Sequence, residues 1–473
     1  MSPLDYVDEL DEMDAVTRGR VYLRSLAGRR VAVVGLARSG VAAARLLRAA
    51  DATVIGVDSK PVAELGREVA ALAEIGVQLR TGADGAAALA GVELVVVSPG
   101  VPLDGEQLAS ARARQVPIIG ELELGWRAIE ADTIAITGTN GKTTTTTLVG
   151  AILAQQPRPV LVAGNIGTPL AAHALAFPAD GLVVCEASSF QLEATELFQP
   201  RVAVVLNLAP DHLDRHGRFE AYVDAKARIF ANQTPADCAV LNFDDEPTRA
   251  LADRTAAPVL WFSRRSPLAH GVFVRNGWIA AKLNGHVEEI CPLSEIFLRG
   301  QHNVENVLAA TACALWTGMA PAAIRSAVGR FRGVAHRIEL VRDLRGVQYF
   351  NDSKGTNVAS TLKALESFPG RIVLIAGGKG KGQAWEPLAD AARGRVVHTV
   401  LIGEDAKQIG AALAAASIPL TYCDSMQAAI DRATAVATPG DVVLLSPACA
   451  SFDMFDNFEH RGDVFKKLVE RLD

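Results

Sequence analysis

The sequence predicts an α/β protein of three domains, each built around a mostly parallel β-sheet. Its 473 residues exceed what one core usually holds, so two to four domains are expected. Short runs rich in β-branched residues alternate with Ala- and Leu-rich helical stretches, and this pattern is typical of parallel sheets. The domains predicted from this alternation are residues 1–130, 131–332 and 333–473.

Composition and charge indicate a globular protein and exclude several other classes. The hydrophobic fraction is 49% and the charged fraction 21%. No apolar run approaches the roughly 18 residues of a membrane span, and a net charge of -6 argues against a nucleic-acid partner. The N-terminus is acidic, unlike a secretory signal, and residues 1–20 are predicted to be a loose lead-in. The six cysteines form no C-x-x-C pair, which favours free thiols in a reducing cytoplasm.

The first block has the pattern of a nucleotide-binding sheet with a damaged fingerprint. Gly35-Leu-Ala-Arg-Ser-Gly40 lacks the middle glycine of G-x-G-x-x-G, because Ala37 stands there. Asp58 ends the next strand, where dinucleotide-binding proteins keep a ribose-binding acid. NAD is therefore possible, but another nucleotide at the same crevice is favoured, since close approach to a pyrophosphate is harder without that glycine. The strands predicted in this block are 29–35, 53–59, 93–100 and 116–120, with a helix at 41–50.

The second block is expected to hold a larger sheet with a small antiparallel patch. Asn-Gly pairs at 276–277 and 284–285 are hairpin signals within residues 271–290. Two helical stretches, 302–318 and 321–331, close the block. Its predicted strands begin near residues 133, 181, 201, 238 and 259.

The stretch "ITGTNGKT" predicts a phosphate-binding loop. It departs from G-x-x-x-x-G-K-[ST] because Ile136 stands at the first glycine position, which implies a shorter loop. An apolar strand leads into it and a helix follows near Lys142, so helix-start N–H groups and the lysine can hold phosphate oxygens. Thr143 is placed to bind magnesium. The alternative is a Gly-rich turn without a ligand.

Two polar stretches follow later strands of the same block. Glu186 ends an apolar strand, where a carboxylate suits magnesium, although it could instead cap the next helix. His212 and His216 have the i, i+4 spacing of a zinc pair, but Pro210 and Gly217 leave little helix, so zinc is disfavoured. His212 could still face a metal and phosphate site.

Lys226 has apolar neighbours one turn away on either side. These are Tyr222 and Val223 before it and Ile229 and Phe230 after it. The lysine is either snorkelling, which the sequence alone favours, or partly buried. A buried amine tends to lose its charge, and a neutral amine can react with carbon dioxide to give a carbamate.

The third block has polar loops after several strands. Asp352 follows one strand, Lys354 lies in a Gly-containing loop, and "IAGGKGKG" follows the next strand. Basic groups there suit an anionic substrate, although solvated surface loops are an open alternative. Phe452, Phe455 and Phe458 near the end have a spacing more typical of a core than of a ligand site. The strands predicted in this block are 347–352, 371–378, 399–403 and 441–448.

Taken in order, nine stretches resemble the Mur ligases over about residues 30 to 470. "NDSKGTN" and "SPACASFD" resemble the D-glutamate-adding branch of that family, and the sibling ligases and folylpolyglutamate synthetases differ at both places. The stretches are "TGTNGKTTTT", "GNIG", "EASSFQLE", "DHLDRHG", "AKARIF", "HNVENVLAA", "HRIE", "NDSKGTN" and "SPACASFDMFDNFEHRG".

The resemblance implies an ATP-dependent ligase of peptidoglycan precursor synthesis. ATP would phosphorylate the alanyl carboxylate of UDP-N-acetylmuramoyl-L-alanine, and the amine of D-glutamate would attack the acyl phosphate to give an amide, ADP and phosphate. It implies a Rossmann-like UDP-substrate domain, a central P-loop ATPase-like domain and a C-terminal Rossmann-like domain for the amino acid. The expected protein is a cytoplasmic monomer.

The resemblance also implies roles for particular residues. Thr143 and Glu186 would hold one magnesium ion, and His212 with a carbamylated Lys226 would serve a second. Lys142, His212 and Lys226 would be catalytic. The ATP site would comprise Gly138, Thr139, Asn140, Gly141, Lys142, Thr143, Thr144, Asn303, Asn306, Arg337 and Asp352.

The substrates would contact both outer domains. Arg38 departs from the family, in which an apolar residue is common there, and this leaves the uracil-edge contacts open. The UDP-linked substrate would meet Ser39, Asp58, Ser59, Ser98, Gly100 and Asn165. D-Glutamate would be framed by Lys381, Ser451, Phe452 and Phe458, with Lys354 and Thr356 nearby. The alternatives are a ligase for another amino acid, such as a folate-type glutamate adder, and an NAD-linked dehydrogenase built on the first block.

Overall fold

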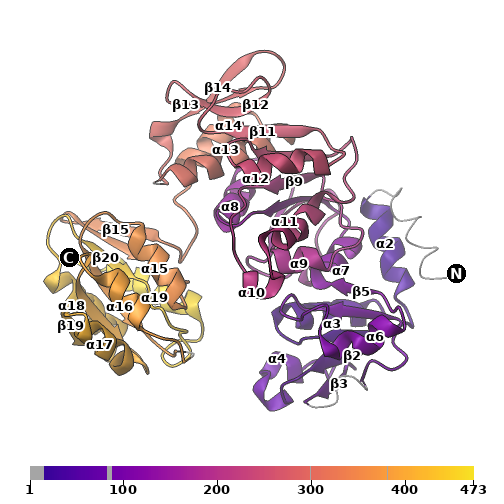
Figure 1. Cartoon of the computed structure of the whole chain (residues 1–473), viewed down its shortest axis with the longest axis horizontal. Coiled ribbons are helices and arrows are strands. Elements are labelled where there is room, and N and C mark those ends of the chain that lie inside the picture. Colours follow the sequence, from indigo (N-terminus) through magenta and orange to yellow (C-terminus); the bar gives the residue numbers. More distant parts are fainter. Residues whose placement is uncertain (1–14, 83–87, 299, 381) are drawn as a thin grey trace. The chain divides into compact units, whose positions relative to one another are not determined.

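The computed structural model describes residues 15–82, 88–298, 300–380 and 382–473. Within these ranges the chain forms β-sheets of five, nine and six strands, coloured in sequence order in Figure 1. The first two sheets lie in one compact unit that ends at Phe331, and the third lies in a second unit that begins at Arg332. The predicted α/β class with three sheets is confirmed, and the domain limits stay a prediction. No helix in the described part of the chain is long and apolar enough to cross a membrane.

The N-terminal sheet is parallel throughout, in the order β3-β2-β1-β4-β5. Its central strand β1 is buried beyond Arg30, as a strand covered on both faces must be. Helix α3 begins at Arg38, within the damaged fingerprint, and buries an Ala- and Leu-rich face. The elements are β1 Arg30–Val34, α3 Arg38–Ala49, β2 Thr53–Asp58, α4 Arg67–Ala70, β3 Gln78–Thr81, β4 Leu94–Val97, α6 Ala109–Ala113 and β5 Ile118–Gly120.

The central sheet has the order β14-β13-β12-β11-β10-β9-β6-β8-β7. It is parallel from β12 to β7, and β12, β13 and β14 form the predicted antiparallel patch. Asn276 and Gly277 both have positive φ (49° and 78°), as a tight hairpin turn requires. The strands are β6 Asp132–Thr137, β7 Val160–Gly164, β8 Leu182–Glu186, β9 Val202–Val205, β10 Cys238–Asn242, β11 Val259–Ser263, β12 Gly271–Arg275, β13 Trp278–Lys282 and β14 Val287–Pro292.

Helices cover the central sheet on both sides. One core joins α8 and α13 to the sheet through residues such as Leu148, Ile152 and Leu308. Another core is shared with the N-terminal sheet through the buried helix α7, with Leu122 and Trp126 in its middle. The helices are α7 Glu121–Ala128, α8 Lys142–Leu153, α9 Ser189–Glu193, α10 Leu213–His216, α11 Phe219–Ala227, α12 Glu246–Arg249, α13 Gln301–Trp316 and α14 Pro321–Arg330.

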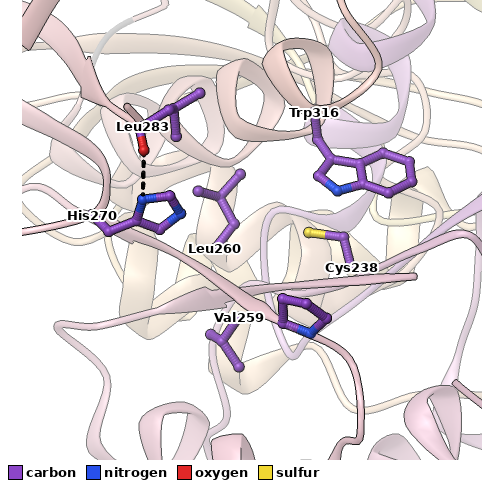
Figure 2. A pocket seen from close by; sticks show the side chains of 7 residues that line it. Cys238, Val259, Leu260, His270, Leu283 and Trp316 are labelled. Carbon is purple, nitrogen blue, oxygen red and sulfur yellow. Dashed lines mark hydrogen bonds between the residues drawn. The ribbon is translucent and has the colours of Figure 1, made fainter. Parts of the chain in front are cut away.

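A shallow apolar hollow of about 220 Å³ opens at the amino ends of β10 and β11. Figure 2 shows the His270 imidazole on one side of it, where Nδ1 donates to Leu283 O over 3.1 Å. Since ligands of parallel sheets bind at the carboxyl ends of the strands, this is the wrong edge for the predicted site. None of the predicted site residues that the structure describes is among its lining, which is Cys238, Pro258, Val259, Leu260, His270, Leu283 and Trp316.

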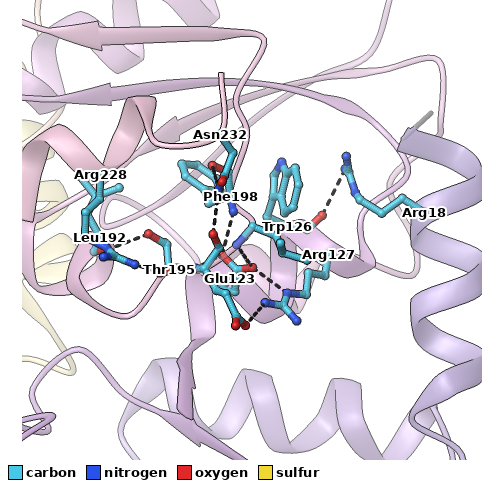
Figure 3. A network of polar contacts seen from close by, with 11 residues as sticks. Arg18, Glu123, Trp126, Arg127, Leu192, Thr195, Phe198, Arg228 and Asn232 are labelled. Atoms are coloured by element: carbon cyan, nitrogen blue, oxygen red, sulfur yellow. Dashed lines mark hydrogen bonds and ion pairs between the residues drawn. The ribbon is translucent and has the colours of Figure 1, made fainter. Parts of the chain in front are cut away.

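Helix α2 (Ala15–Ser25) overlaps the segment predicted to be a loose lead-in. The prediction is wrong for residues 15–20, because Arg18 is only 8% exposed and lies 3.9 Å above the Trp126 ring (Figure 3). Its guanidinium also donates to Trp126 O and Ile129 O over 3.3 and 3.4 Å. Burying the apolar face of a large aromatic ring under a cation stabilises the helix against the rest of the unit.

A buried carboxylate holds α7 against the segment that follows α9 (Figure 3). Glu123 is fully buried and accepts from Arg127 Nε over 2.6 Å. It also accepts from the backbone N–H groups of residues 196, 197 and 198 over 2.9–3.1 Å. A buried charge is tolerable only when it is paired and hydrogen-bonded in this way. Arg228, just after α11, donates to Leu192 O in α9 and to Thr195 O in the segment that follows it.

The C-terminal unit contains a six-stranded sheet in the order β15-β16-β20-β17-β18-β19. All neighbours are parallel except β15 and β16. Apolar cores lie on both faces of the sheet. Two strands, β15 and β19, were not predicted, because both are exposed or half-buried at the sheet edges. The elements are β15 Glu339–Leu344, β16 Val347–Asn351, α15 Val358–Glu366, β17 Ile372–Gly377, α16 Glu386–Ala392, β18 Val396–Ile402, α17 Ala406–Ala415, β19 Leu420–Tyr422, α18 Met426–Val436, β20 Val442–Leu445 and α19 Phe458–Glu470.

Candidate active site

The predicted phosphate loop lies between the end of β6 and the start of α8. Gly141 caps α8 in a left-handed conformation (φ 83°), so the first turn of the helix begins at Lys142. Asn207, at the end of the neighbouring strand, holds the loop: its Oδ1 accepts from Asn140 N over 2.9 Å, and its backbone O accepts from Thr139 N over 2.9 Å. Thr143 is buried and Thr144 is half-buried in the first helical turn. A helix start with a glycine cap is the arrangement that binds phosphate oxygens.

Asn306 of α13 lies directly beside this loop. Its Oδ1 accepts from Thr145 Oγ1 over 3.2 Å, and its Nδ2 donates to Asn303 Oδ1 over 3.0 Å. A Cβ on Gly141 would collide with Asn306 Oδ1, so the loop needs glycine at this position for space as well as for its backbone conformation. The structure therefore places both predicted asparagines, 303 and 306, at the phosphate loop.

Lys226 is buried, so the snorkelling interpretation is wrong. The residue is only 1% exposed. Its Nζ donates to Gly138 O over 2.9 Å and to Thr137 Oγ1 over 3.2 Å. Burial, and secondly the charge of Lys142, hold the pKa of Lys226 well below its usual value. The ring of Tyr222 lies 4.8 Å from Nζ. Burial therefore favours the neutral form of the amine, which is the form that can act as a nucleophile toward carbon dioxide.

Glu186 ends β8 and is 2% exposed. Asn165 Nδ2 donates to its Oε1 over 2.8 Å, whereas its buried Oε2 has no hydrogen-bond partner among the described residues. Glu186 does not cap the following helix, because Ser188 caps α9 in a capping box with Gln191. A buried carboxylate oxygen without a protein partner is open to a cation as a ligand.

Glu186 and Thr143 suit a magnesium ion better than a metal that needs a complete set of protein ligands. No group of three or more His, Cys, Asp or Glu side chains converges within the described ranges. Magnesium usually takes one or two protein carboxylates, with phosphate oxygens and water supplying the rest. Glu186, with its unpaired oxygen, and Thr143 provide such a partial set.

His212 stands at the start of the four-residue helix α10 in a left-handed conformation (φ 51°). Its side chain is half-exposed, and its ring centroid lies 4.9 Å from that of Phe190 on α9. The structure therefore brings His212 to the helix that follows Glu186. His216 is not a second metal ligand there, because both of its ring nitrogens have protein partners, Ser189 and Glu193.

The predicted UDP-substrate residues meet at the carboxyl edge of the N-terminal sheet. Ser98 is buried and donates from Oγ to Gly35 O over 2.7 Å. Asp58 accepts from Leu36 N over 2.8 Å and from Lys60 N over 3.0 Å. These contacts order the two loops that border the crevice. Of the remaining predicted residues, Ser39 is half-buried in α3, and Ser59 and Gly100 are exposed.

Arg38, the departure from the family pattern, reaches the central sheet. Its guanidinium donates to the carbonyl of Gly167, in the "GNIG" loop after β7. Asn165 of the same loop is the residue that contacts Glu186. The first-block crevice and the central site are thus joined within one unit by Arg38.

In the C-terminal unit, Asp352 lies just after β16 and is 5% exposed. Ser446 Oγ donates to its Oδ2 over 2.7 Å. Burial raises the pKa of Asp352 to about 7, although the Ser446 hydrogen bond and the charge of Arg337 oppose the rise. Arg337 is itself exposed.

The predicted amino-acid residues of this unit lie on two loops that Arg461 of α19 joins. Arg461 is only 1% exposed. Its guanidinium donates to Ser353 Oγ over 2.9 Å and to Ser353 O over 2.8 Å. It also donates to Cys449 O and Ala450 O over 3.1 and 3.3 Å. Burial lowers its pKa to about 10. Lys354 and Thr356 follow Ser353 and are half-buried, and Ser451, 2% exposed, follows Ala450.

The aromatic residues of this region do not behave alike. Phe452 is 72% exposed, so the expectation of a core role is wrong for it, whereas Phe455 packs against a core. Phe458 begins α19, and its backbone O accepts from Ser353 Oγ over 2.8 Å. An exposed phenylalanine beside buried polar loops is available to a ligand. Lys381 lies outside the described residues.

Three residues that lie at the site were not predicted from the sequence. Tyr222 bonds Thr139 Oγ1 through its hydroxyl over 3.0 Å, Asn207 holds the phosphate loop, and Arg461 joins the amino-acid loops. For Asn207, the position after an apolar strand was a usable signal. Tyr222 and Arg461 had none, because their partners are far away in the sequence.

Three family models match the chain in succession. They are described as "Mur ligase MurD-like, N-terminal domain", "Mur ligase middle domain" and "Mur ligase, glutamate ligase domain". They match residues 29–120, 136–314 and 336–449, respectively. Each match falls on one of the three sheets.

Relatives of similar length share nearly half of the residues. UDP-N-acetylmuramoylalanine–D-glutamate ligase of Koribacter versatilis is 46% identical, over 94% of this chain and 98% of its own. The protein of the same name from Acidobacterium capsulatum is 48% identical, over 94% of this chain and 96% of its own. Among solved structures, UDP-N-acetylmuramate-alanine ligase of Thermotoga maritima has a TM-score of 0.54 at 20% identity, covering 93% of this chain and 99% of its own. At that identity the likeness is one of fold.

Proposed function

The chain belongs to the Mur ligase family, and from that premise we propose that it joins D-glutamate to UDP-N-acetylmuramoyl-L-alanine at the expense of ATP. The observation that carries the proposal is the 46–48% identity to D-glutamate ligases over 94% of the chain. The reaction belongs to peptidoglycan precursor synthesis. The folate-type and dehydrogenase alternatives find no comparable support.

The chemistry requires two anions to meet. The carboxylate of the alanyl group attacks the terminal phosphorus of ATP, ADP leaves, and the acyl phosphate is then attacked by the amine of D-glutamate with loss of phosphate and a proton. Lys142, beside the helix start, offsets charge on the phosphates, and the N–H groups of the first turn of α8 orient them. Asn306 keeps the loop in position through Thr145.

Magnesium would be held by Thr143 and Glu186, with the unpaired Oε2 of Glu186 as the supporting observation. When bound, it supplies positive charge that lowers the repulsion between carboxylate and triphosphate. A second ion would be served by His212 and by Lys226 as a carbamate. The neutral form of the Lys226 amine, which burial favours, would attack carbon dioxide and lose a proton to water, so that an anion replaces the amine.

The substrates would be bound by the loops at the carboxyl ends of the outer sheets. Asn165, with the residues around Ser98 and Asp58, would meet the UDP-linked substrate, and adenine would meet Asn303 and Asn306. Arg337 and Asp352 would lie on the phosphate and ribose side of ATP. D-Glutamate would be framed by Ser451, Phe452, Phe458 and Lys381, with Lys354 and Thr356 nearby. All six cysteines are free thiols, which supports a cytoplasmic setting, and a monomer remains our expectation.

The test is phosphate release with each substrate omitted in turn. Release that requires ATP, UDP-N-acetylmuramoyl-L-alanine and D-glutamate together supports the proposal. L-Glutamate, other amino acids and a folate acceptor serve as controls for the sibling and folate-type activities. Release with one of these in place of D-glutamate would overturn it.

A further inference from the structure

Glu193, the last residue of α9, binds two side chains of the neighbouring helix α10. Its Oε2 lies 3.0 Å from the guanidinium of Arg215, and its Oε1 lies 3.0 Å from His216 Nδ1. All three side chains are at least four-fifths buried. One carboxylate therefore holds the two last residues of α10 at once, in a setting where charge-assisted hydrogen bonds are strong.

His216 carries the contact on to the start of α9. Its Nε2 lies 3.0 Å from Ser189 Oγ. Because a carboxylate only accepts, Nδ1 carries the proton toward Glu193, and in the neutral ring Nε2 accepts from the Ser189 hydroxyl. The order Ser189–His216–Glu193 is that of a hydrolytic triad. However, Ser189 is 2% exposed in the first helical position, so its hydroxyl braces the imidazole and is no nucleophile.

Helix α10 depends on such contacts for its position. It is four residues long, far below the length at which a helix is stable alone, and His212 precedes it in a left-handed conformation. Phe190 lies under it, with ring centroids 4.9 Å from His212 and 5.6 Å from His216, and the Arg215 guanidinium lies 5.2 Å from the same ring. The placement of His212 thus follows from how α10 is held on α9.

Arg215 extends the contact to the N-terminal sheet. The nitrogen of Arg215 that pairs with Glu193 also donates to Val101 O over 3.2 Å. Val101 follows the loop that holds Ser98 and Gly100, two of the predicted contacts of the UDP-linked substrate. Glu193 is therefore connected to both the His212 side and the substrate side of the site.

We propose that Glu193 is a positioning residue for the ligase reaction, holding His212 and the 98–101 loop in register through Arg215 and His216. This inference rests on the proposed function. No role was predicted for Glu193 from the sequence, although it is the last residue of the stretch "EASSFQLE". Glu193 is thus fixed between the Arg215 guanidinium and the His216 imidazole, both of which lie against the Phe190 ring.

The test compares Glu193→Gln with Glu295→Gln, which breaks an exposed carboxylate–arginine pair elsewhere in the same unit. We expect Glu193→Gln to lower kcat for phosphate release about tenfold or more, because small displacements of reacting groups are costly. KM for D-glutamate should change less than about twofold, a split that general unfolding would not produce. A double variant, Glu193→Ala with Arg215→Ala, should be no slower than the slower single variant. Wild-type kcat in Glu193→Gln would overturn the inference.

Amide hydrogen exchange separates this inference from the proposed function. The N–H groups of Arg215, His216 and Gly217 bond to His212 O and Leu213 O, and they should exchange at least about tenfold faster in Glu193→Gln than in Glu295→Gln. This readout needs no activity. Unchanged exchange would overturn the inference even if the ligase assay succeeds, whereas faster exchange with an inactive wild type would support the hold of Glu193 on α10 and overturn only the proposed function.

Discussion

Lys142 and Lys226 donate to the same carbonyl oxygen, that of Gly138, each over 2.9 Å. Two ammonium groups sharing one oxygen in a buried setting would repel each other strongly. Burial and the charge of Lys142 lower the pKa of Lys226, so Lys226 is the amine whose neutral form this setting favours. The two lysines therefore have different chemistry at the same loop, and this difference can be tested.

Lys226→Ala should lose at least about a hundredfold in phosphate release, and short carboxylic acids such as acetate should restore part of it. The reason is that a free carboxylate can take the place of the proposed carbamate in the cavity left by the side chain. The measurement is the rate of ATP-dependent phosphate release with and without the acid. Full activity of Lys226→Ala would contradict the carbamate.

Lys142→Met is the matched variant of the same loop and should be inactive with or without the acid. Its loss removes a charge from the phosphate side, which an anion cannot replace. Lys467→Ala, at an exposed position of α19, should retain wild-type activity. Equal rescue of the two loop variants would show that the acid acts in some general way.

Gly141→Ala should abolish nucleotide binding and destabilise the protein. The substitution forces a side chain into a left-handed conformation and into Asn306 Oδ1. Gly277→Ala is the control for strain alone, because Gly277 has a similar φ of 78° with nothing within 4 Å of an added Cβ. We expect the control to cost about 1–2 kcal/mol of stability and no ATP affinity. Calorimetric titration with ATP and thermal unfolding measure both, and equal losses in the two variants would contradict the steric account.

Glu121→Gln should remove a pH-dependent loss of stability. Burial raises the pKa of Glu121 from its usual 4.5 to about 7, and its Oε2 has no hydrogen-bond partner among the described residues. Between these values the folded state holds a proton that the unfolded state releases. The free energy of unfolding therefore falls as pH rises from about 4.5 to 7, by on the order of 3 kcal/mol, and is level above that.

Thermal unfolding at pH 5 and pH 8 measures this effect. Wild-type protein should lose more stability between the two values than Glu121→Gln, whose amide does not titrate. Glu295→Gln should follow wild type. The same pH dependence in wild type and in Glu121→Gln would show that another group is responsible.

Arg461→Met should raise KM for D-glutamate at least about tenfold and leave KM for the UDP-linked substrate nearly unchanged. The variant keeps an unbranched side chain but leaves the carbonyls of Ser353 and Cys449 without their donor, so both loops relax. Unsatisfied buried carbonyls also cost about 1–3 kcal/mol each. Steady-state kinetics with each substrate varied provides the check, with Arg393→Met, at an exposed pair of the same unit, as control. Equal rises in both KM values would argue against a role confined to the amino-acid loops.

Much of the fold could be predicted because its signals are local. The hairpin at Asn276-Gly277 follows from two residues that tolerate positive φ, and the strand–loop–helix around Lys142 follows from an apolar run, glycines and a helix start. The edge strands β15 and β19 could not be found in this way, because half-exposed strands have no continuous apolar run. Helix α2 was missed because an acidic segment precedes it and its anchor, Trp126, lies 108 residues from Arg18.

The α/β class, the glycine-containing strand–loop–helix around residues 138–143 and the polar residues at strand ends follow from the sequence alone, since each depends on neighbours along the chain. The burial of Lys226 and its lowered pKa come from the tertiary structure, since the Gly138 carbonyl that it binds lies 88 residues away. The tertiary structure alone brought Arg461 to Ser353 across 108 residues and Glu193 to Arg215 across 22. A side chain's burial, charge state and partners are set by elements that pack against it, and a linear pattern does not contain those distances.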